Sequence, residues 1–137
     1  MIVVDASVLT DFLLGRSAAR DAVMGALGGR DHEALHAPEL IEPETLNALR
    51  RLALGGKITD RRATEAARDL AAARLVRYGH APLRERVWDL RHDLTAYDAM
   101  YLALAEALDD VVLLTGDRGL AGRARRSLGD DRIREIR

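Results

Sequence analysis

The chain of 137 residues contains no cysteine, one lysine, one tryptophan and one phenylalanine. Without cysteine it has neither disulfides nor a thiolate ligand or nucleophile, and this fits the cytoplasmic location that we expect. No apolar run approaches the roughly 18 residues that cross a membrane, so no membrane partner is expected. Residues 1–5 end with the charged Asp5 and lack the basic segment that begins a signal peptide.

The composition that remains is typical of globular proteins. Hydrophobic residues make up 48% and charged residues 31%, with a formal net charge of −1. The length predicts a single domain over residues 1–137, and the charge excludes a polycation drawn as a whole to nucleic acid. Apart from Lys57 every basic residue is an arginine, which can hold phosphate through two parallel hydrogen bonds.

Short apolar segments alternate with helical patterns along the whole chain. Strands are predicted at residues 2–4, 35–37, 75–78, 111–114 and 133–136. Helices are predicted at residues 7–14, 40–54, 59–73, 83–90 and 95–108, at 17–28 with Ser17 as N-cap, and as a short helix after Gly119. This alternation predicts a three-layer α/β/α fold with a short, mostly parallel central sheet. Sites in such folds lie beyond the carboxyl ends of the strands.

Four acidic residues stand out against this pattern. Asp5 and Asp117 lie at or just after the carboxyl ends of predicted strands. Asp98 is the only charged residue of an otherwise apolar helical stretch, where a carboxylate needs a partner. Glu44 lies near the start of the helix at residues 40–54, with Asn47 one turn later. The four could converge on one cleft.

Each acid also has a simpler structural explanation. Asp5 can be an ordinary helix N-cap, and Asp117 can form an Asx-turn. Thr95 and Asp98 have the spacing of a capping box, which would satisfy Asp98 with backbone groups. Glu44 can be a favourable partner of the helix dipole. Taken one at a time, the residues do not separate these explanations from a functional role.

Taken together, the acids favour a metal site. Mg²⁺ and Mn²⁺ prefer oxygen ligands, and such ions support phosphodiester hydrolysis. Two carboxylates about 6 Å apart repel by roughly 3 kcal/mol at an effective dielectric constant of about 20. The summed repulsion of several such pairs would be comparable to the free energy of unfolding of a whole domain, about 5–15 kcal/mol. A cluster of this kind therefore needs a cation to offset the repulsion.

Four stretches carry a resemblance to a known family. They are Val-Val-Asp-Ala-Ser-Val-Leu at residues 3–9, the segment 37–51, Leu-Thr-Ala-Tyr-Asp-Ala at 94–99 and Leu-Leu-Thr-Gly-Asp at 113–117. In order and spacing they resemble the PIN-domain family, and its VapC toxin branch in particular. The resemblance implies a compact α/β fold, Mg²⁺ or Mn²⁺ as cofactor, and endonucleolytic cleavage of RNA. It also implies a homodimer held by a cognate VapB-like antitoxin whose tail blocks the cleft.

The resemblance also assigns site residues. The acidic positions of the family, expected to be catalytic and metal-binding, fall on Asp5, Glu44, Asp98 and Asp117. Asp5 and Asp98 would be the most direct ligands, and the other two would act directly or through water. Supporting hydrogen bonds are expected from Ser7, Asn47 and Thr115. The chain departs from the family pattern at Pro43 and at His92-Asp93, and neither departure removes a ligand.

Other protein classes fit the sequence less well. A signalling receiver domain needs an acidic pair after its first strand and a late lysine, where this chain has Ala6 and Ser7 and a lysine only in mid-chain. A histidine-based ribonuclease needs histidines that converge, and here they are scattered at positions 32, 36, 80 and 92. The remaining alternative is a catalytically silent PIN-like protein that binds RNA or a partner without cutting.

Overall fold

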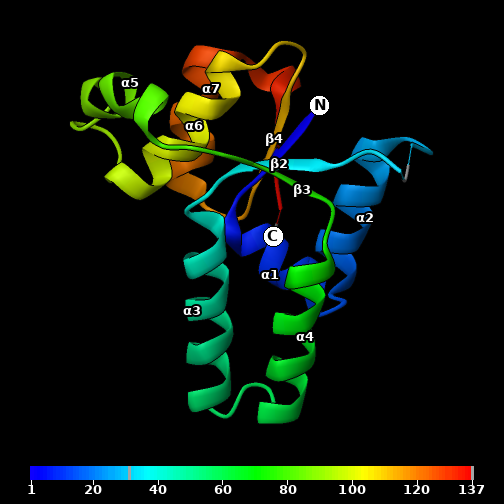
Figure 1. Ribbon diagram of the computed structural model, residues 1–137. Helices are drawn as coiled ribbons and strands as arrows, with labels where there is room; N and C mark the ends of the chain where they lie inside the picture. Colours follow the sequence, from blue (N-terminus) through cyan, green and yellow to red (C-terminus); the bar gives the residue numbers. More distant parts are fainter. Residues whose placement is uncertain (31, 137) are drawn as a thin grey trace.

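The computed structural model describes residues 1–30 and 32–136, and its centre is a five-stranded sheet between two layers of helices (Figure 1). The strands are β1 (Ile2–Val4), β2 (Leu35–Pro38), β3 (Leu75–Tyr78), β4 (Val112–Thr115) and β5 (Ile133–Glu135). They lie in the order β3-β2-β1-β4-β5, and every neighbouring pair is parallel. The predicted three-layer α/β/α fold is therefore confirmed.

The helices divide between the two faces of the sheet by their position in the chain. One layer contains α1 (Ala6–Leu13), α2 (Ser17–Leu27), α3 (Ile41–Leu54) and α4 (Asp60–Ala72). The other contains α5 (Arg84–Asp89), α6 (Ala96–Ala107) and α7 (Arg118–Leu128), with short 3₁₀ turns at Ala81–Leu83 and Asp130–Arg132. Figure 1 shows α3 and α4 as a pair that projects away from the sheet. No described helix is both long and apolar enough to cross a membrane.

The core follows from the position of β1 in the middle of the sheet. Val3 and Val4 of β1 and Leu113 and Leu114 of β4 are fully buried, because helices cover both faces of these strands. Leu102 of α6 is fully buried against the sheet as well. The short apolar runs that predicted strands are therefore the centre of the hydrophobic core.

Side-chain caps set where several helices begin. Asp5, Thr59, Thr95 and Asp117 each accept a hydrogen bond from the backbone N–H three residues later, at the starts of α1, α4, α6 and α7. The prediction for Ser17 was wrong: Arg16 occupies the N-cap of α2, and Ser17 is its first helical residue. Gly28 ends α2 as expected, in a left-handed conformation with φ of 56°.

The length of α7 and the buried face of α3 also follow from the structure. The helix predicted after Gly119 begins before that residue and is 11 residues long, because Asp117 caps it. In α3, Leu49 is buried whereas Leu46, three residues before it, is 46% exposed. A helix covered on one side has a narrow buried stripe, and Leu46 lies outside it.

Candidate active site

One pocket of about 500 Å³ at the carboxyl ends of the strands contains all four predicted acids. Asp5 follows β1, and Asp117 follows β4. Glu44 and Asp98 lie in the first turns of α3 and α6. The pocket is lined by these four acids together with Ala6, Ser7, Thr10, Asp11, Arg16, Ala48, Arg51, Leu52 and Tyr101.

Asp5 is the most buried of the four acids, with 5% of its surface exposed. Its Oδ1 accepts hydrogen bonds from the Ser7 hydroxyl at 2.6 Å and from the backbone N–H of Val8 at 3.0 Å. Its Oδ2 accepts one from the Thr115 hydroxyl. Burial raises the pKa of Asp5, and these hydrogen bonds oppose the rise because they favour the charged form. The carboxylate is thus held in one orientation from two strand ends.

Gly116 brings the β4 end of the pocket close to the β1 end. Its backbone N–H donates to the Ser7 hydroxyl oxygen at 3.1 Å, and a Cβ at this position would come within 2.9 Å of that oxygen. A larger residue would therefore displace Ser7, which in turn holds Asp5. The glycine in Thr-Gly-Asp is required by this close approach, a constraint that the sequence pattern did not reveal.

Glu44 is positioned by Tyr101, a residue that sequence reasoning did not assign to the site. The Tyr101 hydroxyl donates to Glu44 Oε1 at 2.6 Å, and the tyrosine is 2% exposed. Burial and this hydrogen bond both raise the pKa of Tyr101, so the phenol keeps its proton and donates it. Tyr101 lies three residues after Asp98, on the same face of α6, and that spacing was the available signal.

Asp98 is both a capping-box residue and a member of the acidic pocket. Its backbone N–H donates to the Thr95 hydroxyl at 3.2 Å, which is the half of a capping box that Thr95 supplies. Its side chain faces the other acids: burial and then the negative charges of Asp117, Glu44 and Asp5 raise the pKa of Asp98 to about 6. Thr95 therefore caps the start of α6, while the Asp98 carboxylate lines the acidic pocket.

Asp117 caps a helix and also lines the acidic pocket. Its Oδ1 accepts from the Leu120 N–H at 2.7 Å at the start of α7, and its own N–H donates to Thr115 at 2.9 Å. Four helices, α1, α3, α6 and α7, begin around the pocket, each with an acid at its cap or in its first turn. The positive ends of their dipoles partly offset the repulsion among the acids.

The predicted supporting residues fall in two places. Ser7 and Thr115 both hold Asp5, as described above. Asn47 does not line the acidic pocket; it lines a second, adjacent pocket that shares Glu44 with the first. Of the predicted site residues, Asn47 therefore shares a pocket with Glu44 alone.

The donor chemistry of the acidic pocket fits a hard divalent cation. All four candidate ligands offer carboxylate oxygen, and no ion pair joins any of them to a basic side chain among residues 1–30 and 32–136. Burial and then the negative charges of the other three acids raise the pKa of Asp98, and a bound cation would offset both effects. Within the described residues no three such side chains meet at a single point, so the acids surround the pocket without forming a closed metal cage.

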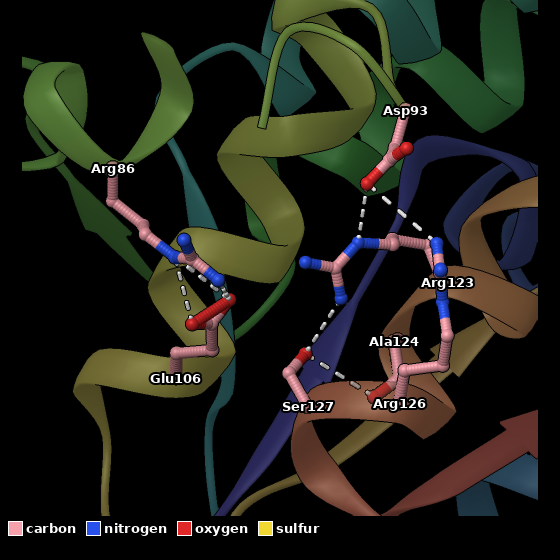
Figure 2. Close-up of polar contacts among 7 residues, drawn as sticks. All are labelled: Arg86, Asp93, Glu106, Arg123, Ala124, Arg126 and Ser127. Carbon is pink, nitrogen blue, oxygen red and sulfur yellow. Dashed lines mark hydrogen bonds and ion pairs between the residues drawn. The ribbon is translucent and has the colours of Figure 1, made fainter. Parts of the chain in front are cut away.

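Asp93, one of the departures from the family pattern, forms salt bridges with two arginines (Figure 2). Its Oδ2 accepts from Arg123 Nε at 2.8 Å and lies 3.6 Å from Arg126 Nη2. These pairs join the turn before α6 to α7. Figure 2 also shows Arg86 of α5 paired with Glu106 of α6 at 2.9 Å. Salt bridges therefore brace the helices that carry Asp98 and Asp117.

Comparison with known proteins agrees with this architecture. The family model described as "PIN domain" matches residues 2–126. Over 120 residues the chain is 43% identical to "Ribonuclease VapC1" of Mycobacterium tuberculosis, covering 87% of each protein. It is 42% identical over 124 residues to "VapC ribonuclease Mb0985" of Mycobacterium bovis, covering 88% of this chain and 89% of the relative. The chain belongs to the PIN-domain family, in the branch that includes the VapC ribonucleases.

Proposed function

We propose that this protein is an endoribonuclease dependent on Mg²⁺ or Mn²⁺ and the toxin of a toxin–antitoxin pair. The observation that carries the proposal is the single pocket lined by Asp5, Glu44, Asp98 and Asp117. The names of its relatives, ribonucleases of the VapC group, support the RNA substrate, and the resemblance to the VapC toxin branch implies the toxin role.

In this proposal the chain supplies ligands and holds them in place. Asp5 and Asp98 are the most direct ligands, and Glu44 and Asp117 complete the set directly or through water. When bound, a divalent cation supplies charge neutralisation at the phosphate and activates water for hydrolysis. Ser7 and Thr115 fix the orientation of Asp5, and Tyr101 fixes that of Glu44. Because these supports are in place before substrate binds, little reorganisation is needed during the reaction.

Arg51 is the residue best placed to meet the RNA backbone. It lines the acidic pocket from the C-terminal half of α3, is exposed, and forms no ion pair within the described part of the chain. The pocket's other arginine, Arg16, is already paired with Asp11 at 2.7 Å. A guanidinium without a partner beside an acidic pocket is suited to bind a phosphate next to the one that reacts.

No histidine is among the described residues that line the acidic pocket, and this affects which ends RNA cleavage is expected to leave. His36 is bonded to the Tyr78 hydroxyl, and His80 accepts the backbone N–H of Leu40, so each is engaged elsewhere. Hydrolysis by water leaves a 5′-phosphate and a 3′-hydroxyl, whereas attack by the 2′-hydroxyl leaves a cyclic phosphate. We expect purified protein, free of antitoxin, to cut RNA internally with Mg²⁺ or Mn²⁺, to stop in EDTA, and to leave 5′-phosphates. Cleavage that persists in EDTA, or cyclic ends, would contradict this mechanism.

One observation favours a second candidate, a silent PIN-like protein that binds RNA or a partner without cutting. Asp5 and Asp117 cap helices through their side chains, so these two acids have structural roles that do not require catalysis. The same assay separates the two candidates. RNA binding without cleavage at any concentration of Mg²⁺ or Mn²⁺ would establish the silent protein.

The proposal includes a homodimer and a cognate VapB-like antitoxin. Leu46 and Leu54 on the projecting α3 are 46% and 71% exposed, which leaves apolar surface for such partners. We expect a dimer by analytical ultracentrifugation at tens of micromolar. Expression without the antitoxin is expected to arrest growth, and co-expression is expected to restore it. A monomer at that concentration would exclude the dimer, and growth unaffected by the chain alone would exclude the toxin role.

A further inference from the structure

A second pocket, of about 400 Å³, lies beside the acidic one. It is lined by Leu40, Pro43, Glu44, Asn47 and Tyr97. Leu40 is the N-cap of α3, three of the others lie in the first half of that helix, and Tyr97 lies at the start of α6. Glu44 lines both pockets, so anything bound in the second lies directly beside the candidate cleavage site.

The wall contributed by α6 is the ring of Tyr97. This side chain is 62% exposed, although it precedes Asp98 directly in a helix that is otherwise largely buried. It has no ring partner within the described residues: the aromatic contacts found there join His36 to Tyr78 and Arg91 to Trp88. The face of the Tyr97 ring is therefore available to a flat ligand.

Asn47 supplies the polar group of this pocket. It lies one turn after Pro43 on α3 and is exposed. No hydrogen bond to its side-chain amide is found in residues 1–30 and 32–136. An amide offers donors and an acceptor together, the combination that pairs with the edge of a nucleobase. Leu40 and Pro43 provide apolar contact for the rest of such a ligand.

We propose that this second pocket binds one nucleobase of the RNA, adjacent to the phosphodiester at the acidic pocket, with Tyr97 stacking on the base and Asn47 contacting its edge. The assignment rests on the proposed ribonuclease function and adds the class of substrate. A base can enter such a pocket only when it is unpaired, so the substrate is single-stranded RNA or a loop.

The lining of the pocket favours a base over other ligands. It contains no arginine or lysine, and Glu44 would repel a phosphate. A peptide segment of a partner would find apolar surface here, but Tyr97 and Asn47 match it less well than they match a flat heteroaromatic ring with a hydrogen-bonding edge. The test therefore includes the peptide as an outcome.

The experiment uses the full chain and a series of short single-stranded RNAs, each with one 2-aminopurine, a base whose fluorescence falls when it stacks. Binding is measured by anisotropy in Ca²⁺ and in EDTA, and cleavage of the same RNAs is measured in Mg²⁺. We expect quenching at one position, next to the cut. Tyr97→Ala should abolish the quenching and weaken binding about tenfold, equivalent to about 1.4 kcal/mol, whereas Tyr97→Phe should retain both.

Two variants sharpen the interpretation. Asn47→Ala should change which base is preferred while leaving the quenching in place. Trp88→Ala removes another exposed aromatic, 67% exposed and outside both pockets, and should change nothing. Quenching without cleavage would support the subsite and contradict the nuclease. Cleavage with no quenched position, or with Tyr97→Ala equal to the wild type, would overturn the subsite alone.

The remaining outcomes are also decisive. Loss of antitoxin binding by Tyr97→Ala, with RNA binding unchanged, would make the pocket a protein-docking surface and overturn the nucleobase proposal. If the wild type binds no RNA at all, the subsite and the proposed function both fail.

Discussion

The hydroxyl of Tyr101 donates a hydrogen bond of 2.6 Å to Glu44, joining α6 to α3 across the acidic pocket. Tyr101→Phe removes this bond and frees the carboxylate. We expect cleavage to fall at least tenfold and the free energy of unfolding to fall by about 1–2 kcal/mol. Tyr78→Phe is the matched control, because it removes a hydroxyl bonded to His36 at 2.7 Å outside the pocket. If both variants cleave alike, Tyr101 has no role in positioning Glu44.

The charge of Asp98 should destabilise the metal-free protein near neutral pH. Its pKa is about 6 in the folded protein against an ordinary value of 3.8, so the folded state holds the proton more tightly than the unfolded chain. Wild-type stability is therefore lost as the pH rises from about 4 to about 6. Asp98→Asn has no such proton, and its advantage should reach about 1–3 kcal/mol above that interval.

Melts between pH 4 and pH 8 without metal, repeated with Mg²⁺, measure this effect. The stabilisation given by Mg²⁺ should shrink in Asp98→Asn, because that contribution depends on binding affinity, and cleavage should drop steeply. Asp69→Asn, at an exposed position of α4, serves as the control. An Asp98→Asn protein that is less stable without metal and still cuts RNA would leave Asp98 as a capping residue only.

Arg51 should affect substrate binding more than the chemical step. Arg51→Gln removes the unpaired guanidinium of the acidic pocket and should raise KM about tenfold with little change in kcat. The effect should diminish at high salt, as phosphate contacts do. Arg50→Gln, one residue away on α3 and outside the pocket, should behave like the wild type. Equal KM values for the two variants would remove Arg51 from the RNA-binding surface.

Asp93 should matter for stability rather than for cleavage. Its side chain touches neither pocket but pairs with Arg123 and Arg126 of α7. Asp93→Asn should lower the free energy of unfolding by about 0.5–1 kcal/mol in low salt, because the side chains are partly exposed. The difference should vanish near 1 M salt, where the Debye length is about 3 Å. A large loss of cleavage at unchanged stability would contradict this structural role.

The position of the candidate site could be predicted from the sequence because it depends only on the order of elements. Parallel strands bring their carboxyl ends to one edge, which places the residues after β1 and β4 at the same edge, and the structure adds that these two strands are neighbours. Asp98 could be singled out because a carboxylate in an apolar helical stretch needs a cation or a hydrogen-bond donor as partner. The neighbours of a residue along the chain and the alternation of strands with helices can both be read from a single sequence.

The contacts across elements could not be predicted in the same way. From Glu44, Asn47 is turned by about 60° in one direction around α3 and Ala48 by about 40° in the other. Ala48 faces the acidic pocket and Asn47 the second one, and the sequence alone does not tell which side of the helix faces which pocket. The bond from Tyr101 to Glu44 spans 57 positions and depends on how two helices pack.

The hydrogen bond between Asp5 and Thr115 joins residues 110 positions apart, and β1 has β4 as one of its two neighbours in the sheet. Synthesis proceeds from the N-terminus, so Asp5 emerges from the ribosome long before Thr115, Gly116 and Asp117 exist. Asp5 therefore lacks its hydrogen-bond partner Thr115 until residue 115 has been synthesised. The cleft of the proposed nuclease is therefore incomplete in a nascent chain beside ribosomal RNA until synthesis has passed residue 117.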